Sequence, residues 1–158
     1  VVYENEPIGT GAMKLPPRPF TTTFFQKKEL LTSALQGIAI TIATLSVYQF
    51  YLIYNYNEAL IRTMVFTVLI SANIFLSLVN RSFYYSIFTT IKYKNKLVPL
   101  VIFITILVTA LLLYFPPFTH FFGFEKLLFS QLANSIFIGG ISVLWIEIFK
   151  WYKRKNNP

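Results

Sequence analysis

Polar side chains that could do chemistry are few in this chain, and most of them stand inside long apolar stretches. Asn73, Ser77 and Asn80 are spaced i, i+4 and i+7, so on a helix they share one face. An amide in the hydrocarbon core needs a hydrogen-bond partner or an ion, because lipid offers it no hydrogen bond. The face therefore predicts either hydrogen bonds between helices or a cation site with Asn73 as a candidate metal ligand. The sequence leaves both readings open.

The other polar residues of the apolar stretches have simpler interpretations. Glu147 is the one carboxylate within these stretches, and it stands three residues before Lys150. This spacing predicts an i, i+3 ion pair whose lysine reaches toward water, with a proton relay as the alternative. We expect the following residues to be structural polar groups within the membrane: Gln36, Ser77, Asn80, Asn134 and Glu147.

The sequence lacks the residues that several kinds of catalytic centre require. The chain has one His, no Cys and no Asp, so a multi-histidine metal site and a thiolate site are both excluded. No glycine-rich phosphate loop is present, and the apolar stretches hold no pair of carboxylates that could share acid–base work. We therefore expect no catalytic and no cofactor-binding residue in this chain, which alone is not an enzyme.

Four long apolar stretches must position these residues, and each is close to the roughly 20 residues that a helix needs to cross a bilayer. The sequence predicts an all-α integral membrane four-helix bundle over residues 31–158. Residues 1–30 are polar and rich in proline, and they predict an extended cytoplasmic connecting segment. The predicted spans are Leu31–Tyr54, Thr63–Val79, Leu97–Phe115 and Leu127–Phe149.

The basic residues between the stretches predict the orientation. Of 14 Lys and Arg, only Arg62 and Lys126 lie in the first and third connections. Positively charged connections stay on the cytoplasmic side, so both termini are predicted to be cytoplasmic. The connections Asn55–Ile61 and Pro116–Lys126 are then outside. The net charge is +8, and the basic residues flank the spans. This placement predicts contact with a bilayer that carries anionic head groups, and no binding of nucleic acid.

Five short segments carry a family resemblance. In chain order they are Met13-Lys14-Leu15-Pro16-Pro17-Arg18, Arg62-Thr63-Met64-Val65-Phe66-Thr67, Asn80-Arg81-Ser82, Leu113-Tyr114-Phe115-Pro116-Pro117 and Trp145-Ile146-Glu147-Ile148-Phe149-Lys150. With this order and spacing, the chain resembles the C-terminal transmembrane region of P-type cation-transporting ATPases, spans seven to ten, in the calcium-pump-like branch. The resemblance covers nearly the whole chain.

The resemblance implies that the chain is the membrane support of an ATP-driven pump for calcium or a related cation. It implies ATP and Mg for the parent protein but no cofactor in this chain. The implied partners are the missing spans and cytoplasmic domains of the parent, and the transported cation. Asn73 falls where calcium pumps of the sarcoplasmic-reticulum type carry a glutamate ligand, so the resemblance makes Asn73 a candidate ligand that lacks the family's charge.

A rival interpretation belongs to a different class. The same four spans could form a stand-alone, non-enzymatic membrane protein that assembles with other membrane subunits. The spans rich in Ile and Phe are typical of bacterial proteins, and they predict a bacterial plasma membrane as the location.

Overall fold

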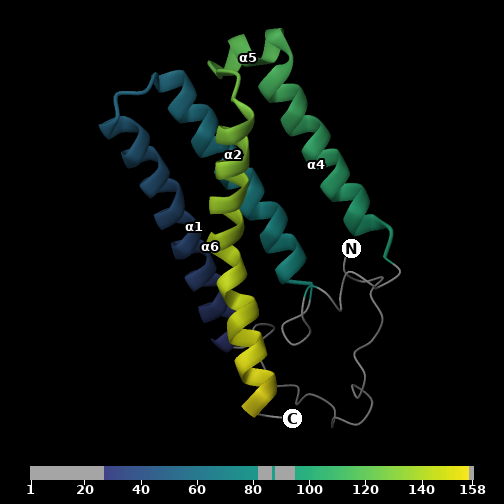
Figure 1. Ribbon diagram of the computed structural model, residues 1–158. Helices are drawn as coiled ribbons and strands as arrows, with labels where there is room; N and C mark the ends of the chain where they lie inside the picture. The colour runs from purple at the N-terminus through teal and green to yellow at the C-terminus, as the bar shows by residue number, and fades with distance from the viewer. Residues whose placement is uncertain (1–26, 82–86, 88–94, 157–158) are drawn as a thin grey trace.

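The chain folds into long helices that run the length of one bundle. The computed structural model describes residues 27–81, residue 87 and residues 95–156 (Figure 1). Its helices are α1 (Lys27–Ile53), α2 (Glu58–Val79), α4 (Leu97–Tyr114), α5 (Pro116–Phe122) and α6 (Phe129–Asn156). All except α5 are long and apolar enough to cross a membrane, which makes four spans in the described residues. The predicted all-α membrane bundle is confirmed.

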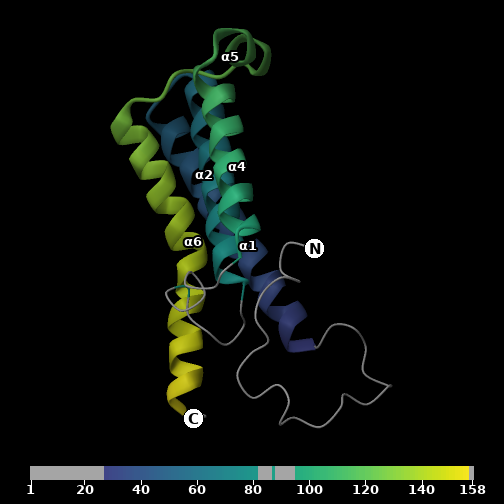
Figure 2. The ribbon, with the colours of Figure 1, turned by 90° about the vertical axis from the view of Figure 1, so that its right-hand side faces the viewer.

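The four long helices alternate in direction. Helices α1, α2 and α6 pack side by side, and α4 lies apart from α1 with α2 between them (Figures 1 and 2). The starts of α1 and α4 and the ends of α2 and α6 lie at one end of the bundle, which we name the basic end after Lys27, Arg81, Lys96 and Lys150. The opposite end carries α5 and is named the α5 end.

The second span begins earlier than predicted. Helix α2 begins at Glu58 rather than Thr63, because Asn57 caps it: the Asn57 Oδ1 accepts a hydrogen bond from the backbone N–H of Ala59 at 3.3 Å. Glu58 in the first turn suits the positive end of the helix dipole. Two charged residues, Glu58 and Arg62, thus belong to the helix and not to the connection.

The first span also begins earlier than predicted, and most of the segment before it lies outside the described residues. Helix α1 begins at Lys27, where residues 1–30 were predicted to be extended. The rest of that prediction, residues 1–26, lies outside the described residues.

The third connection contains a short helix of its own. Pro116 and Pro117 stand at its first positions, where the missing N–H groups of proline cost no hydrogen bond. Gly123 ends it with a φ of 61°, a left-handed conformation that glycine adopts without strain. The two prolines therefore stop α4 and start α5 at the same point.

The core of the bundle lies mainly between α2 and α6. The backbones approach closely at Gly139, where a Cβ atom would lie 2.8 Å from the carbonyl oxygen of Val68. Helix α4 contributes little to this core, since Val98 and Leu113 are its buried residues. Two clusters of buried side chains form the core: Val47, Leu60, Met64, Val68 and Leu127 in one, and Ala72, Val79, Val143 and Ile146 in the other.

Candidate functional site

The face of α2 that carries Asn73 is not covered by any described helix. The side chains of Asn73 and Ser77 are exposed, whereas Met64 and Ser71, on the opposite side of the helix, are buried. Asn73 makes no side-chain hydrogen bond to the described residues. Because α2 begins at Glu58, Asn73 lies about 7 Å from the middle of the helix. The predicted span Thr63–Val79 is shorter and would place Asn73 closer to its middle. An amide at this depth in hydrocarbon needs a partner from outside the described chain.

Asn80 belongs to the same predicted face, but the structure gives it a partner. The Gln36 Nε2 donates a hydrogen bond to the Asn80 Oδ1 at 2.9 Å, and the Asn80 Nδ2 donates one to the Gln36 Oε1 at 3.3 Å. Gln36 is buried in α1, so this amide pair joins α1 to the end of α2. Its oxygens are used in holding two helices together, which separates Asn80 from the open face of Asn73.

Glu147 and Lys150 form an ion pair at the basic end, with 3.0 Å between the Lys150 Nζ and the Glu147 Oε1. Lys150 does not reach toward water, contrary to the prediction from the sequence. It is 4% exposed, and its Nζ donates a second hydrogen bond to the carbonyl oxygen of Val79 at 2.6 Å. The last carbonyls of a helix lack partners within the helix, so the end of α2 offers this lysine an acceptor.

The same ion pair reaches the chain beyond α2. The Glu147 Oε2 accepts a hydrogen bond from the backbone N–H of Ile87 at 3.3 Å. We name the two polar contacts at this end the basic-end lock: the Gln36–Asn80 pair, and the Glu147–Lys150 pair with the Val79 carbonyl. The lock ties α1 and α6 to the end of α2.

Polar contacts at the α5 end were missed by the sequence analysis. The Arg62 Nη1 donates to the carbonyl oxygens of Phe122 and Gly123, at 3.3 and 3.4 Å, and so caps α5. The backbone N–H of Glu125 donates to the Thr63 Oγ1 at 2.9 Å. From the sequence, Arg62 was treated as a charge in a connection and as part of a family segment, and no contact was predicted for its side chain. The adjacent pair Arg62-Thr63 within one of the five family segments was the signal that could have indicated a structural role.

Asn134 is the second amide with an uncovered side chain. It is exposed on α6, and within the described residues its side chain makes no hydrogen bond. Val143, on the opposite side of α6, is fully buried against α2. Asn73 and Asn134 therefore lie on the outward faces of two helices that pack against each other, and the structure does not bring them together.

The described residues cannot form a carboxylate or histidine metal centre by themselves. Among residues 27–81, 87 and 95–156, no three His, Cys, Asp or Glu side chains lie close enough together to hold a metal ion. Any cation held at Asn73 would need most of its oxygen ligands from elsewhere.

Four apolar spans and polar contacts at both ends define an integral membrane domain. A sequence profile of the family described as "Cation transporting ATPase, C-terminus" matches residues 1–152, and the chain therefore belongs to this family of C-terminal regions of P-type cation pumps. It is similar to Calcium-transporting ATPase 1 of Schizosaccharomyces pombe, with 26% identity over 152 residues. The match covers 96% of this chain and 17% of that protein, so the chain spans about a sixth of its relative's length.

Proposed function

We propose that this domain braces the ion-binding spans of an ATP-driven pump that transports calcium or a related cation, and that the parent protein supplies ATP and Mg chemistry. The supporting observation is the uncovered face of α2, where an intramembrane amide has no partner within the described chain. A missing span of the parent would cover this face and satisfy Asn73. A stand-alone four-span protein is not favoured, because the family profile covers nearly the whole chain.

We further propose that Asn73 contributes its amide oxygen to the transported cation. The described residues leave this oxygen unused, while the oxygens of Asn80 and Gln36 bond to each other's amide groups. One neutral oxygen suits a hard cation only together with carboxylates and carbonyls from other spans. The missing spans would have to provide them.

The experiment replaces Asn73 with alanine in the full-length parent pump. If Asn73 is a ligand, the apparent affinity for the cation falls roughly 5- to 150-fold, which corresponds to about 1–3 kcal/mol for a buried polar partner left unsatisfied. The measurement is the cation concentration that gives half-maximal phosphoenzyme formation. Asn134→Ala is the matched control, because it removes another exposed amide from the opposite side of the α2–α6 pair, and it should leave that concentration unchanged.

A second outcome would reject the ligand role. If Asn73 only bonds to a neighbouring helix, Asn73→Ala lowers the melting temperature in detergent and leaves the half-maximal cation concentration unchanged. The stability cost would then be about 0.6 kcal/mol, the average for hydrogen bonds between membrane helices.

The orientation of the domain is proposed from its charges: the basic end is cytoplasmic and the α5 end is outside. Cysteines placed singly at His120 and Lys155, both exposed positions at opposite ends, test this in a parent pump without other cysteines. The His120 variant should react with a membrane-impermeant thiol reagent in intact cells, and the Lys155 variant only after permeabilisation. The reverse pattern would invert the proposed topology. A bacterial plasma membrane stays a prediction from composition, and the relative named above is from a yeast.

A further inference from the structure

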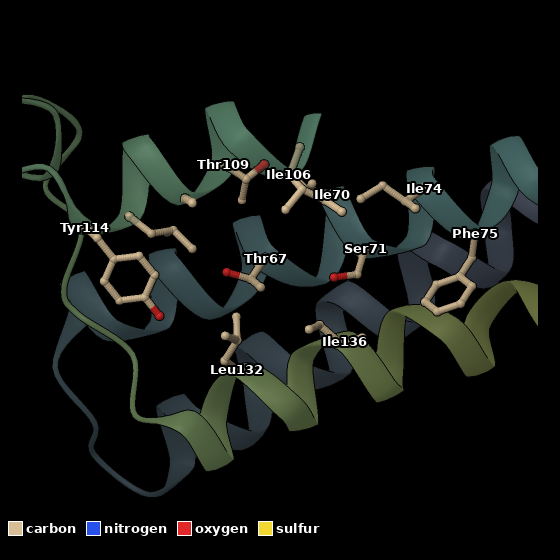
Figure 3. A pocket seen from close by; sticks show the side chains of 12 residues that line it. Thr67, Ile70, Ser71, Ile74, Phe75, Ile106, Thr109, Tyr114, Leu132 and Ile136 are labelled. Atoms are coloured by element: carbon tan, nitrogen blue, oxygen red, sulfur yellow. The ribbon is translucent and has the colours of Figure 1, made fainter. Parts of the chain in front are cut away.

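Helices α4 and α5 form an arm, and the described residues attach this arm to the rest of the bundle mainly near its two ends. The buried residues of α4 are Val98 in its first turn and Leu113 in its last turn. Between them, side chains of α2 and α4 line an open groove rather than a packed interface (Figure 3). The position of the arm therefore depends on the contacts at its ends.

The two threonines that line the groove do not join α4 to α2. The Thr67 Oγ1 donates a hydrogen bond to the carbonyl oxygen of Thr63 at 2.8 Å, and the Thr109 Oγ1 donates one to that of Thr105 at 2.7 Å. Each hydroxyl group is thus satisfied within its own helix. A polar contact between the arm and α2 has to lie beyond the end of α4.

Arg62, near the start of α2, supplies such a contact. Its Nη1 donates to the carbonyl oxygens of Phe122 and Gly123 at the end of α5, where carbonyl groups lack partners within the helix and favour a cation. Gly123 leaves the space for this approach, because a Cβ atom on residue 123 would overlap the Arg62 Nη1. The next residue of α2 extends the contact, since the Thr63 Oγ1 accepts a hydrogen bond from the backbone N–H of Glu125 at 2.9 Å.

We propose that Arg62 is a latch. Its guanidinium group holds the arm against the start of α2, and loss of this contact lets the α5 end of the arm move away while α1, α2 and α6 stay packed. The packing of these three helices does not require the arm, because no residue of α4 or α5 belongs to the two described clusters of buried side chains. The latch does not depend on the proposed cation site.

The test measures how fast a cysteine in the last turn of α4 reacts with a thiol reagent, in the full-length parent pump without other cysteines and reconstituted in nanodiscs. Leu113 is 2% exposed, so Leu113→Cys should react slowly while the latch is closed. Adding Arg62→Ala should raise the rate roughly tenfold, because the loss of a hydrogen bond from a charged donor makes opening easier by about that factor.

Two controls separate the latch from general effects. Leu60→Cys places the thiol in the core near the start of α2, and it should react slowly with or without Arg62. Lys126→Ala removes a positive charge from the same end of the bundle, and within the described residues the Lys126 side chain makes no hydrogen bond or ion pair. It should leave the rate at position 113 unchanged.

Gly123→Asn breaks the same contact from the opposite side. Asparagine tolerates the left-handed conformation at a φ of 61°. Its Cβ would displace the guanidinium group, which ends a flexible side chain and moves aside without disturbing the backbone. This variant should raise the rate at position 113 about as much as Arg62→Ala, and it tests the latch independently if Arg62→Ala does not fold. Because both act through one contact, the double variant should react no faster than the faster single variant.

An unchanged rate at position 113 in Arg62→Ala or in Gly123→Asn would overturn the latch. It would show that the arm is held by other contacts, such as that of the Phe66 ring with the Phe124 ring, whose centroids are 5.0 Å apart, or by another span of the parent. An equal rise at position 60, or in Lys126→Ala, would show a general loosening of this end instead. Rates that multiply in the double variant would show that residues 62 and 123 act separately.

Discussion

Replacing Glu147 with leucine should destabilise the domain more than replacing its partner Lys150 with methionine. Glu147→Leu removes the carboxylate that lies 3.0 Å from the Lys150 ammonium, which is 4% exposed and also donates to the Val79 carbonyl oxygen. Breaking a buried ion pair by removing one partner costs about 3–5 kcal/mol. Lys150→Met leaves a carboxylate that is 18% exposed and keeps the hydrogen bond from the Ile87 N–H, so we expect about 1–3 kcal/mol, the scale for a polar group that loses a partner.

The double variant Glu147→Leu/Lys150→Met separates the charge effect from the packing effect. It removes both charges, and its free energy of unfolding should return toward that of the wild type, giving a favourable coupling between the two positions. The measurement is unfolding of the purified parent pump in mixed micelles by a denaturing detergent. A Lys150→Met variant as unstable as Glu147→Leu, or additive single effects, would show that the buried ammonium is not what the pair stabilises.

Replacing Gly139 with alanine should separate α6 from α2. The added Cβ would lie 2.8 Å from the Val68 carbonyl oxygen and 2.9 Å from the backbone nitrogen of Ala72. Both are backbone atoms, so they yield only if one helix moves. Overpacking of this kind costs about 1–3 kcal/mol, more than the roughly 1 kcal/mol that alanine gains over glycine in a helix.

Two other glycines serve as controls for this substitution. At Gly140 the added Cβ would meet the edge of the Phe75 ring at 3.2 Å, and a ring can rotate, so Gly140→Ala should cost less. At Gly37 the Cβ would meet nothing within 4 Å in the described chain. Melting temperatures of the isolated 158-residue chain should fall most for Gly139→Ala, less for Gly140→Ala, and not at all for Gly37→Ala. A different order would contradict the close approach of α2 and α6.

The four spans were predictable because a run of about 20 apolar residues has few alternatives to a membrane helix. The start of α2 was not, because Glu58 and Arg62 look like the end of a span. Their charges are accommodated by contacts that sequence spacing does not reveal: Arg62 binds carbonyl groups about 60 residues away. A local pattern cannot predict a partner that arrives through the fold.

In the candidate site, too, features of a single helix could be predicted and contacts between helices could not. The spacing of Asn73 and Ser77 placed them on one face, and the structure leaves both on an uncovered face of α2. The partner of Asn80 could not be predicted, because Gln36 belongs to another helix. Lys150 was expected to reach toward water on the basis of its own helix. Its burial depends on the Val79 carbonyl at the end of α2, an acceptor that exists only in the assembled bundle.

The pairing of α2 with α6 has a consequence for how the domain is made. A ribosome releases α1 and α2 first, then α4 and α5, and the main partner of α2 comes last. Until α6 has entered the membrane, the face of α2 that carries Met64, Val68 and Ala72 lacks the helix that covers most of it in the folded domain. Insertion of the spans and closure of the core are therefore separate events in time. A chain that stops translation before residue 129 would have three of the four spans of this domain inserted and the α2–α6 core unformed. Cellular quality control would then meet a domain whose spans have the correct topology but lack their main packing contact.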